Sequence, residues 1–131
     1  MECPIPPDYC QGHRPATNFL TAAGGFMQAV LYGFLGLRYN DANMTILAPT
    51  LALNASSMAV HGLNYRGSQL AVEWNSASAS VVCMGGCDSN LCAGAATRVG
   101  GVQKLSPGAS THFLAGTTIV VAVCSAHEGA A

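Results

Sequence analysis

The residues from Asn18 to Arg38 read NFLTAAGGFMQAVLYGFLGLR, and no charged residue lies between Arg14 and Arg38. Apolar residues recur through this stretch at helical spacing, and Phe26, Ala29 and Tyr32 fill much of the opposite side. A helix that is apolar on every side is normally buried. The stretch therefore predicts one buried helix near the start of the chain, and it decides how the remaining residues are interpreted.

The ends of this helix are marked by short polar residues and by glycine. Thr17 or Asn18 can cap the start, because a short polar side chain accepts from the free amides of the first turn. Gly36 allows a stop at the far end. We therefore expect the helix to occupy residues 17–36, with Gly24 and Gly25 permitting the close approach of a neighbouring helix.

Two other interpretations of the same stretch are weaker. A transmembrane span needs about 20 apolar residues, but Gln28 and the pair Gly24-Gly25 interrupt this segment, and no basic cluster flanks it. A signal peptide does not fit either, because residues 1–17 are too long and too polar for the segment that precedes its apolar core. A membrane partner is therefore not expected, and a core helix of a larger assembly is the favoured interpretation.

Composition points in the same direction. Only 8% of the 131 residues are charged, whereas about a quarter is typical of a free-standing domain. Such a chain is expected to bury much of its surface against something else. Five Lys and Arg against six Asp and Glu produce no field that would attract nucleic acid or an anionic membrane, and both are excluded as partners.

After the helix the apolar period changes to two, which is typical of strands. The expected strands fall in two hairpins and three later segments: 37–40 with 44–47, 58–66 with 69–74, then 78–83, 112–115 and 117–124. Gly67 can supply the positive φ of the second hairpin turn, and Tyr65 and Arg66 are expected to stabilise that hairpin rather than catalyse. Residues 84–101 are rich in small residues and are interpreted as a long loop.

Short strands at this spacing predict a small antiparallel β-sandwich. The fold class is thus mainly β, with one N-terminal buried helix followed by the sandwich. The expected organisation is an irregular lead-in over 1–16, the helix over 17–36, the sandwich domain over 37–125 and a tail over 126–131.

Six cysteines and two glycosylation sequons indicate the cellular compartment of the protein. An even number of cysteines in a short chain fits disulfides formed in an oxidising environment, although their pairing stays open. The spacing of Cys83, Cys87 and Cys92 is not that of a zinc ribbon, so no metal or cofactor is expected. Asn43-Met-Thr and Asn54-Ala-Ser are acceptor sequences for glycosylation. Together these features favour a secreted or lysosomal protein over a cytoplasmic one.

No catalytic constellation is visible. The acidic residues are scattered over the termini, turns and one strand: Glu2, Asp8, Asp41, Glu73, Asp88 and Glu128. The four histidines lie in no nucleophile motif. We therefore assign no catalytic residue within this chain.

Several motifs resemble glycoside hydrolase family 65. The opening stretch resembles the last barrel helix of that family through Gly24-Gly25, Gln28-Ala29, Gly33-Phe34 and Gly36-Leu37-Arg38. Leu47-Ala-Pro-Thr-Leu and His61-Gly-Leu-Asn-Tyr-Arg-Gly-Ser-Gln-Leu70 resemble a strand end and a hairpin of the same family. The resemblance runs from Asn18 to about Trp74.

This resemblance implies that the helix is the last one of an (α/α)6 barrel and that the sandwich is the C-terminal domain behind it. The chain would be the C-terminal part of an α-glucosidase that acts on glucosyl-galactosyl-hydroxylysine or a related α-glucoside such as trehalose. Its partners would be the upstream barrel of the same protein, which carries the two catalytic carboxylates, and the carbohydrate substrate.

The resemblance also implies substrate-binding positions in the first helical turn, namely Asn18, Phe19 and Thr21. In the phosphorylases of the family a histidine in this turn contributes to phosphate binding, and Phe19 takes its place here, which favours hydrolysis. The alternative is that Asn18 only caps the helix and Phe19 only packs. A second function class also stands: a secreted, disulfide-containing β-sandwich binding or structural module without catalysis, whose helix anchors a membrane or a partner.

Overall fold

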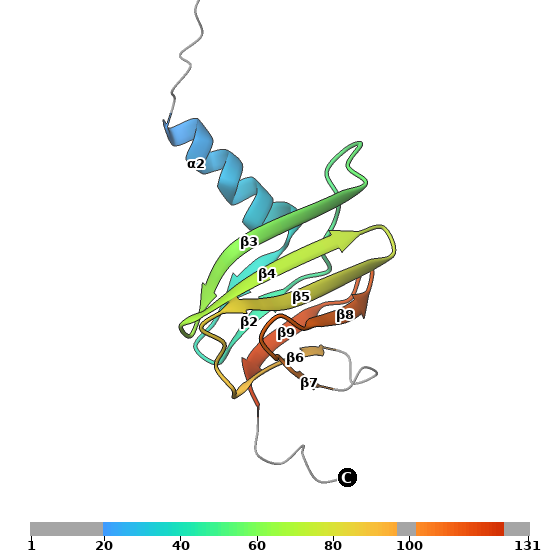
Figure 1. The fold of residues 1–131 in the computed structure, drawn as a ribbon. Coiled ribbons are helices and arrows are strands. Elements are labelled where there is room, and N and C mark those ends of the chain that lie inside the picture. Colours follow the sequence, from blue (N-terminus) through green and yellow to red (C-terminus); the bar gives the residue numbers. More distant parts are fainter. Residues whose placement is uncertain (1–19, 97–101, 125–131) are drawn as a thin grey trace, which may run out of the picture.

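A computed structural model describes residues 20–96 and 102–124 of the chain. One helical segment projects from two layers of β-sheet (Figure 1). The helix α2 spans Leu20–Gln28 and continues as a π-helical segment, η1, over Ala29–Phe34. The strands are β1 (Leu37–Tyr39), β2 (Asn43–Ile46), β3 (Ser57–Tyr65), β4 (Ser68–Asn75), β5 (Ser78–Gly85), β6 (Leu91–Ala95), β7 (Gln103–Lys104), β8 (Ser110–Leu114) and β9 (Ile119–Val123).

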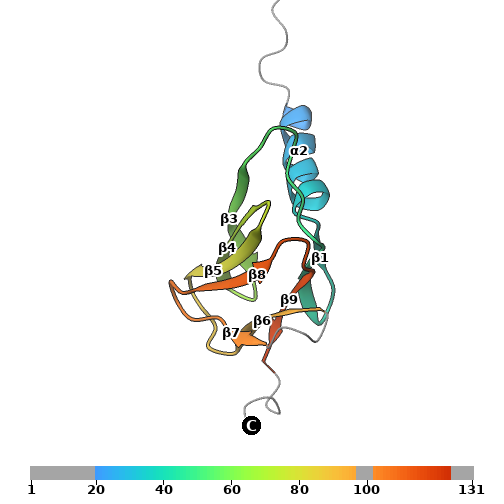
Figure 2. The same ribbon diagram turned by 90° about the vertical axis from the view of Figure 1, so that its right-hand side faces the viewer.

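The strands form two antiparallel sheets, which confirms the prediction of a mainly β structure. Sheet A has the order β1-β2-β9-β6-β7, and sheet B has the order β3-β4-β5-β8. The two sheets face each other when the molecule is viewed from the side (Figure 2). The chain crosses from sheet A to sheet B between β2 and β3, and it returns between β5 and β6.

Both predicted hairpins form, and turn chemistry explains why. In the β1–β2 turn the side-chain oxygen of Asn40 accepts from the amides of Ala42 and Asn43 at 2.9 and 2.8 Å. In the β3–β4 turn Arg66 and Gly67 have φ values of 49° and 79°. Two consecutive residues at positive φ match the twist of the flanking strands.

The core lies between the sheets, and in strands such as β2 and β5 it is built by alternate residues. Trp74 is 2% exposed, and the core side chains Leu70, Ile119 and Val121 are fully buried. The core begins at the joint with the helix, because Leu35 and Leu37 are also buried. The period-two pattern therefore identified those strands in which every second residue faces the opposite sheet.

The burial predicted for this helix within a larger assembly is not provided by the described part of this chain. No residue of α2 or η1 is buried, and Leu20 and Phe26 are 85% and 68% exposed. The sandwich contacts only the far end of the helical segment, where Leu31 and Phe34 pack against the core. An apolar surface on every side needs neighbours on every side, and the described residues supply them only at one end. The origin of this helix in a barrel stays a prediction.

The interpretation of residues 84–101 as one long loop is also wrong, because this range contains β6. Its sequence, Leu-Cys-Ala-Gly-Ala, has small residues on both faces and shows no alternation. The strand forms because β9 pairs with it from Leu91 to Ala95. The expected lead-in over 1–16 and tail over 126–131 lie outside the described residues, and the domain boundaries at 17, 36 and 125 stay predictions.

Candidate functional site

The structure places one of the three substrate-binding positions expected from the sequence. Asn18 and Phe19 lie outside the described residues. Thr21 lies in the first turn of α2 and is exposed. This turn is at the end of the helix that points away from both sheets (Figure 1). Among the described residues, no side chain of the strands therefore completes a site at Thr21, and a complete site there needs a further neighbour.

The other end of the helix is joined to the sandwich by hydrogen bonds that no sequence pattern predicted. Gly36 takes φ of +69°, and its carbonyl accepts from the amide of Leu47 at 3.0 Å. The carbonyl of Phe34 accepts from the amide of Thr50 at 2.8 Å. The carbonyl of Thr50 accepts in turn from the indole Nε1 of Trp74 at 2.8 Å. Free carbonyls at a helix end need such partners.

Arg38 adds a side-chain contact at the same joint. Its Nη1 donates to the carbonyls of Tyr32 and Leu37 at 3.0 and 2.6 Å. A cation at the C-terminal end of a helix is favourable, because the last carbonyls carry partial negative charge. Arg38 therefore ties the last turn of η1 to β1.

Tyr39 and Tyr65 lie together where the β1–β2 hairpin meets the end of β3. The rings of Tyr39 and Tyr65 lie 6.3 Å apart, and the guanidinium of Arg66 lies 5.8 Å from the Tyr65 ring. The Tyr65 hydroxyl donates to the carbonyl of Ala42 at 3.3 Å. Burial raises the pKa of the Tyr39 phenol above its ordinary value, and Tyr32 and Tyr65 raise it further. The bond between Tyr65 and Ala42 links the β3–β4 hairpin to the β1–β2 hairpin.

The carboxylates of the described residues do not form a pair suited to glycoside cleavage. Asp41 lies in the β1–β2 turn, Glu73 lies on β4, and Asp88 follows β5. The Oε1 of Glu73 is 3.8 Å from the Nε2 of His61, and both side chains are 59% exposed on the outer face of sheet B. An exposed contact of this kind contributes little. Asp88 is engaged locally, because its Oδ1 accepts from the amide of Asn90.

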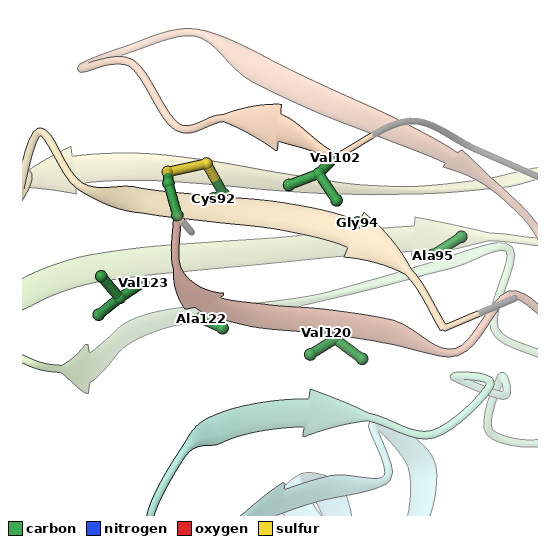
Figure 3. Close-up of a pocket in the computed structure, with 8 residues that line it drawn as sticks. Cys92, Gly94, Ala95, Val102, Val120, Ala122 and Val123 are labelled. Carbon is green, nitrogen blue, oxygen red and sulfur yellow. A yellow bond between two sulfur atoms is a disulfide. The ribbon is translucent and has the colours of Figure 1, made fainter. Parts of the chain in front are cut away.

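A small groove lies on the outer face of sheet A (Figure 3). Its volume is about 140 Å³, whereas ligand pockets typically enclose about 300 Å³ or more. It is lined by Cys92, Gly94, Ala95, Val102, Val120, Ala122, Val123 and Cys124. These side chains are apolar or disulfide-bonded, so none of them carries a hydroxyl, amide or carboxylate group that could orient a sugar.

Two disulfides join the cysteines of the second half of the molecule. Cys83 pairs with Cys87, and Cys92 pairs with Cys124. Such bonds form in extracellular and lysosomal proteins and are rare in the cytosol. In residues 20–96 and 102–124 no helix is both long and apolar enough to span a membrane. Over the same residues, no cluster of three or more His, Cys, Asp or Glu side chains is arranged to hold a metal ion.

The two sequons differ in their surroundings. Asn54 is exposed in the loop between β2 and β3 and has φ of 64°. Asn43 opens β2, and its Oδ1 accepts from the Asn40 amide group and from the Thr45 hydroxyl at 2.9 and 3.0 Å. The strand ranges expected from the sequence leave both asparagines in loops. Asn54 does lie in a loop, whereas Asn43 begins β2 because the turn ends one residue earlier.

Comparison with known proteins finds similarity to one group of curated enzymes. The protein-glucosylgalactosylhydroxylysine glucosidase of Gallus gallus is 44% identical over 55 residues, which are 42% of this chain and 8% of the relative. The enzyme of the same name from Dictyostelium discoideum is 37% identical over 60 residues, 46% of this chain and 8% of the relative. That from Danio rerio is 39% identical over 64 residues, 49% of this chain and 9% of the relative.

No protein-family model and no solved structure matches the chain. The matched regions span less than a tenth of the length of these curated relatives. About half of this chain is therefore similar to a small part of a much longer glucosidase.

Proposed function

We propose that this chain is the C-terminal part of an α-glucosidase resembling glycoside hydrolase family 65. Its substrate is glucosyl-galactosyl-hydroxylysine or a related α-glucoside such as trehalose. In this proposal α2 and η1 form the last helix of the catalytic barrel, and the sandwich supports that barrel from one end. The names of the similar enzymes support the substrate class.

One observation carries the proposal: the helix is apolar on every side, and the sandwich leaves most of it uncovered. Leu20, Phe26 and Met27 are 85%, 68% and 55% exposed. Exposed apolar surface of this extent marks a site of contact with another body. A barrel helix has such neighbours on all sides, so the barrel would cover these side chains.

The chemistry of the proposed reaction divides between this chain and the barrel. Inverting cleavage of a glycoside needs one carboxylic acid and one carboxylate roughly 6.5–9.5 Å apart. Neither α2 nor η1 contains an acidic residue, so both groups would come from the barrel. This chain would contribute the first helical turn, where free amides and the residues Asn18, Phe19 and Thr21 face a sugar hydroxyl.

A chimera tests the proposal directly. This chain replaces the matched segment of the Gallus gallus glucosidase, and glucose release from glucosyl-galactosyl-hydroxylysine and from trehalose is measured. We expect the chimera to release glucose from at least one of them. The same chimera with Phe26→Asp on the helix is the matched variant, and it should lose assembly and activity because a charge would enter the barrel interface.

The isolated chain of 131 residues is the second arm of the experiment. We expect it to release no glucose from either substrate or from an aryl α-glucoside. Glucose release by the purified isolated chain would contradict the proposal that both catalytic carboxyl groups come from the barrel. A well-folded chimera without activity on any of these α-glucosides would contradict the proposed function itself.

The second candidate is a secreted sandwich module without catalysis. The observation that favours it is the independent core of the sandwich, which is supplemented by two disulfides. This candidate predicts that the isolated chain is monomeric and stable, and that the helix can be removed from it without loss of the sandwich.

A further inference from the structure

A line of two hydrogen bonds connects the end of the helix to the centre of the core. The Phe34 carbonyl, at the last position of η1, accepts from the Thr50 amide at 2.8 Å. The Thr50 carbonyl accepts from Trp74 Nε1, also at 2.8 Å. Both distances are typical of well-formed bonds. We call Phe34, Thr50 and Trp74 the helix clamp.

Trp74 is the fixed end of the helix clamp. It lies on β4, which has strand partners on both sides, β3 and β5. The indole is 2% exposed, and it is the only tryptophan of the chain. A buried indole N–H without an acceptor would be costly, so the Thr50 carbonyl and the ring hold each other in place.

The loop between β2 and β3 is the middle element of the helix clamp. It passes from sheet A to sheet B, and within it Ala48 has φ of 41°. Leu47, one residue earlier, donates to Gly36 at 3.0 Å. The loop therefore contacts the chain on both sides of Leu35, and it holds the exit of the helix at two points.

We propose that Trp74 is a positioning residue that sets the direction of the helix through Thr50. The functional part of this inference rests on the proposed function, in which the first helical turn faces the substrate. From Leu20 to Phe34 the helix is about 20 Å long. A rotation of about 10° at the helix clamp would then move the first turn by roughly 4 Å, and displacements near 1 Å already affect catalysis strongly.

The first experiment uses the chain alone and measures hydrogen exchange of the Trp74 indole N–H by NMR. Because the chain has one tryptophan, its indole N–H gives one signal. Ala29→Pro kinks the helix at the start of η1, the segment that ends at Phe34 of the helix clamp, and Ala23→Pro is the matched control in α2. We expect Ala29→Pro to speed exchange of the indole N–H at least tenfold, with the Ile119 amide of sheet A unchanged. Equal indole exchange in the two variants would overturn the proposal.

The second experiment works in the opposite direction. Trp74→Phe keeps an aromatic ring in the core but removes the N–H donor. We expect exchange of the Thr50 amide to accelerate at least tenfold. Val72→Ala is the control, because Val72 is fully buried on the same strand and takes no part in the helix clamp. If both variants accelerate Thr50 and the sandwich amides alike, Trp74 is only a core residue and the proposal fails.

The chimera with the Gallus gallus glucosidase supplies the functional test. With Trp74→Phe we expect kcat/KM to fall at least fivefold at a temperature where the protein remains folded, and Val72→Ala to change it less than twofold. Equal losses in the two variants would overturn the functional part. If the unsubstituted chimera is inactive, the proposed function fails, while the two NMR experiments still decide whether Trp74 holds the helix.

Discussion

The helix and the sandwich of this chain are both rich in apolar residues, but they use them differently. In the sandwich, Ile119 and Val121 of sheet A and Leu70 and Val72 of sheet B face each other and are fully buried. In the helix, no side chain of Leu20–Phe34 is buried. The difference shows that apolar character alone does not specify burial. Each sheet of the sandwich packs against the other sheet, whereas most of the helix has no packing partner among the described residues.

Removing one disulfide should give the largest loss in the sandwich. The Cys92–Cys124 bond closes a loop of 32 residues, and the Cys83–Cys87 bond closes one of 4. The longer loop restricts the unfolded chain more. Replacing Cys92 and Cys124 by Ala should therefore lower the free energy of unfolding by about 4 kcal/mol, whereas replacing Cys83 and Cys87 should lower it by about 2 kcal/mol. Urea unfolding followed by Trp74 fluorescence measures both, and equal losses would contradict this reasoning.

Truncating one apolar side chain in each region tests the comparison directly. Ile119→Ala leaves a cavity between the sheets and should cost about 2–5 kcal/mol. Phe26→Ala on the exposed helix should change the free energy of unfolding by less than about 0.5 kcal/mol and should reduce self-association. Urea unfolding and analytical ultracentrifugation measure the two effects. A loss at Phe26 similar to that at Ile119 would show that the helix is covered in the isolated chain.

Two glycines provide a sharper test of the same comparison. Gly36 has φ of +69°, and a Cβ there would lie 2.5 Å from the Leu47 carbonyl oxygen, so Gly36→Ala should cost about 2 kcal/mol. A Cβ at Gly24 meets nothing within 4 Å, so Gly24→Ala should stabilise the helix by about 0.5–1 kcal/mol. Circular dichroism follows both. In the chimera Gly24→Ala should instead hinder assembly if a neighbouring helix approaches there.

Arg66→Ala should give the smallest effect. It removes the contact of Nε with the Tyr65 hydroxyl at 3.4 Å and the interaction with the Tyr65 ring. The expected loss is about 0.5–1 kcal/mol, seen as a lower melting temperature, with turnover of the chimera unchanged within about twofold. Arg66→Asn is the control, because asparagine suits this left-handed turn position. Loss of turnover at unchanged stability would instead assign Arg66 a role in the reaction.

Most strands were predictable because one face of each is buried. Alternation identified β3 and β4, a continuous β-branched run identified β9, and Gly67 identified the turn between β3 and β4. Alternation failed at β6, whose small residues tolerate either face. It also could not show how the helix is held, because the helix clamp uses backbone atoms of Phe34 and Thr50, and any residue carries those. Of the three residues of the helix clamp, only Trp74 takes part through its side chain, which the sequence identifies. Its acceptor lies 24 residues away in the sequence.

The pairing of six cysteines allows fifteen arrangements, and spacing did not select among them. The structure brings Cys92 and Cys124 together because β6 and β9 are neighbours. Whether the first helical turn binds substrate could not be decided from the sequence either. Thr21 is placed, but a site around it requires a surface that the described residues do not supply.

The position of β9 has a consequence for biosynthesis. This strand lies between β2 and β6, so Asn43 pairs with Ala122 and Ile46 with Ile119. Ribosomes add about 5–20 residues per second, so β2 would wait roughly 4–15 seconds for its neighbour. Sheet B has no such delay between β3, β4 and β5, which are consecutive hairpins. Sheet A therefore assembles last, and until then Met44 and Ile46 are candidates for chaperone binding.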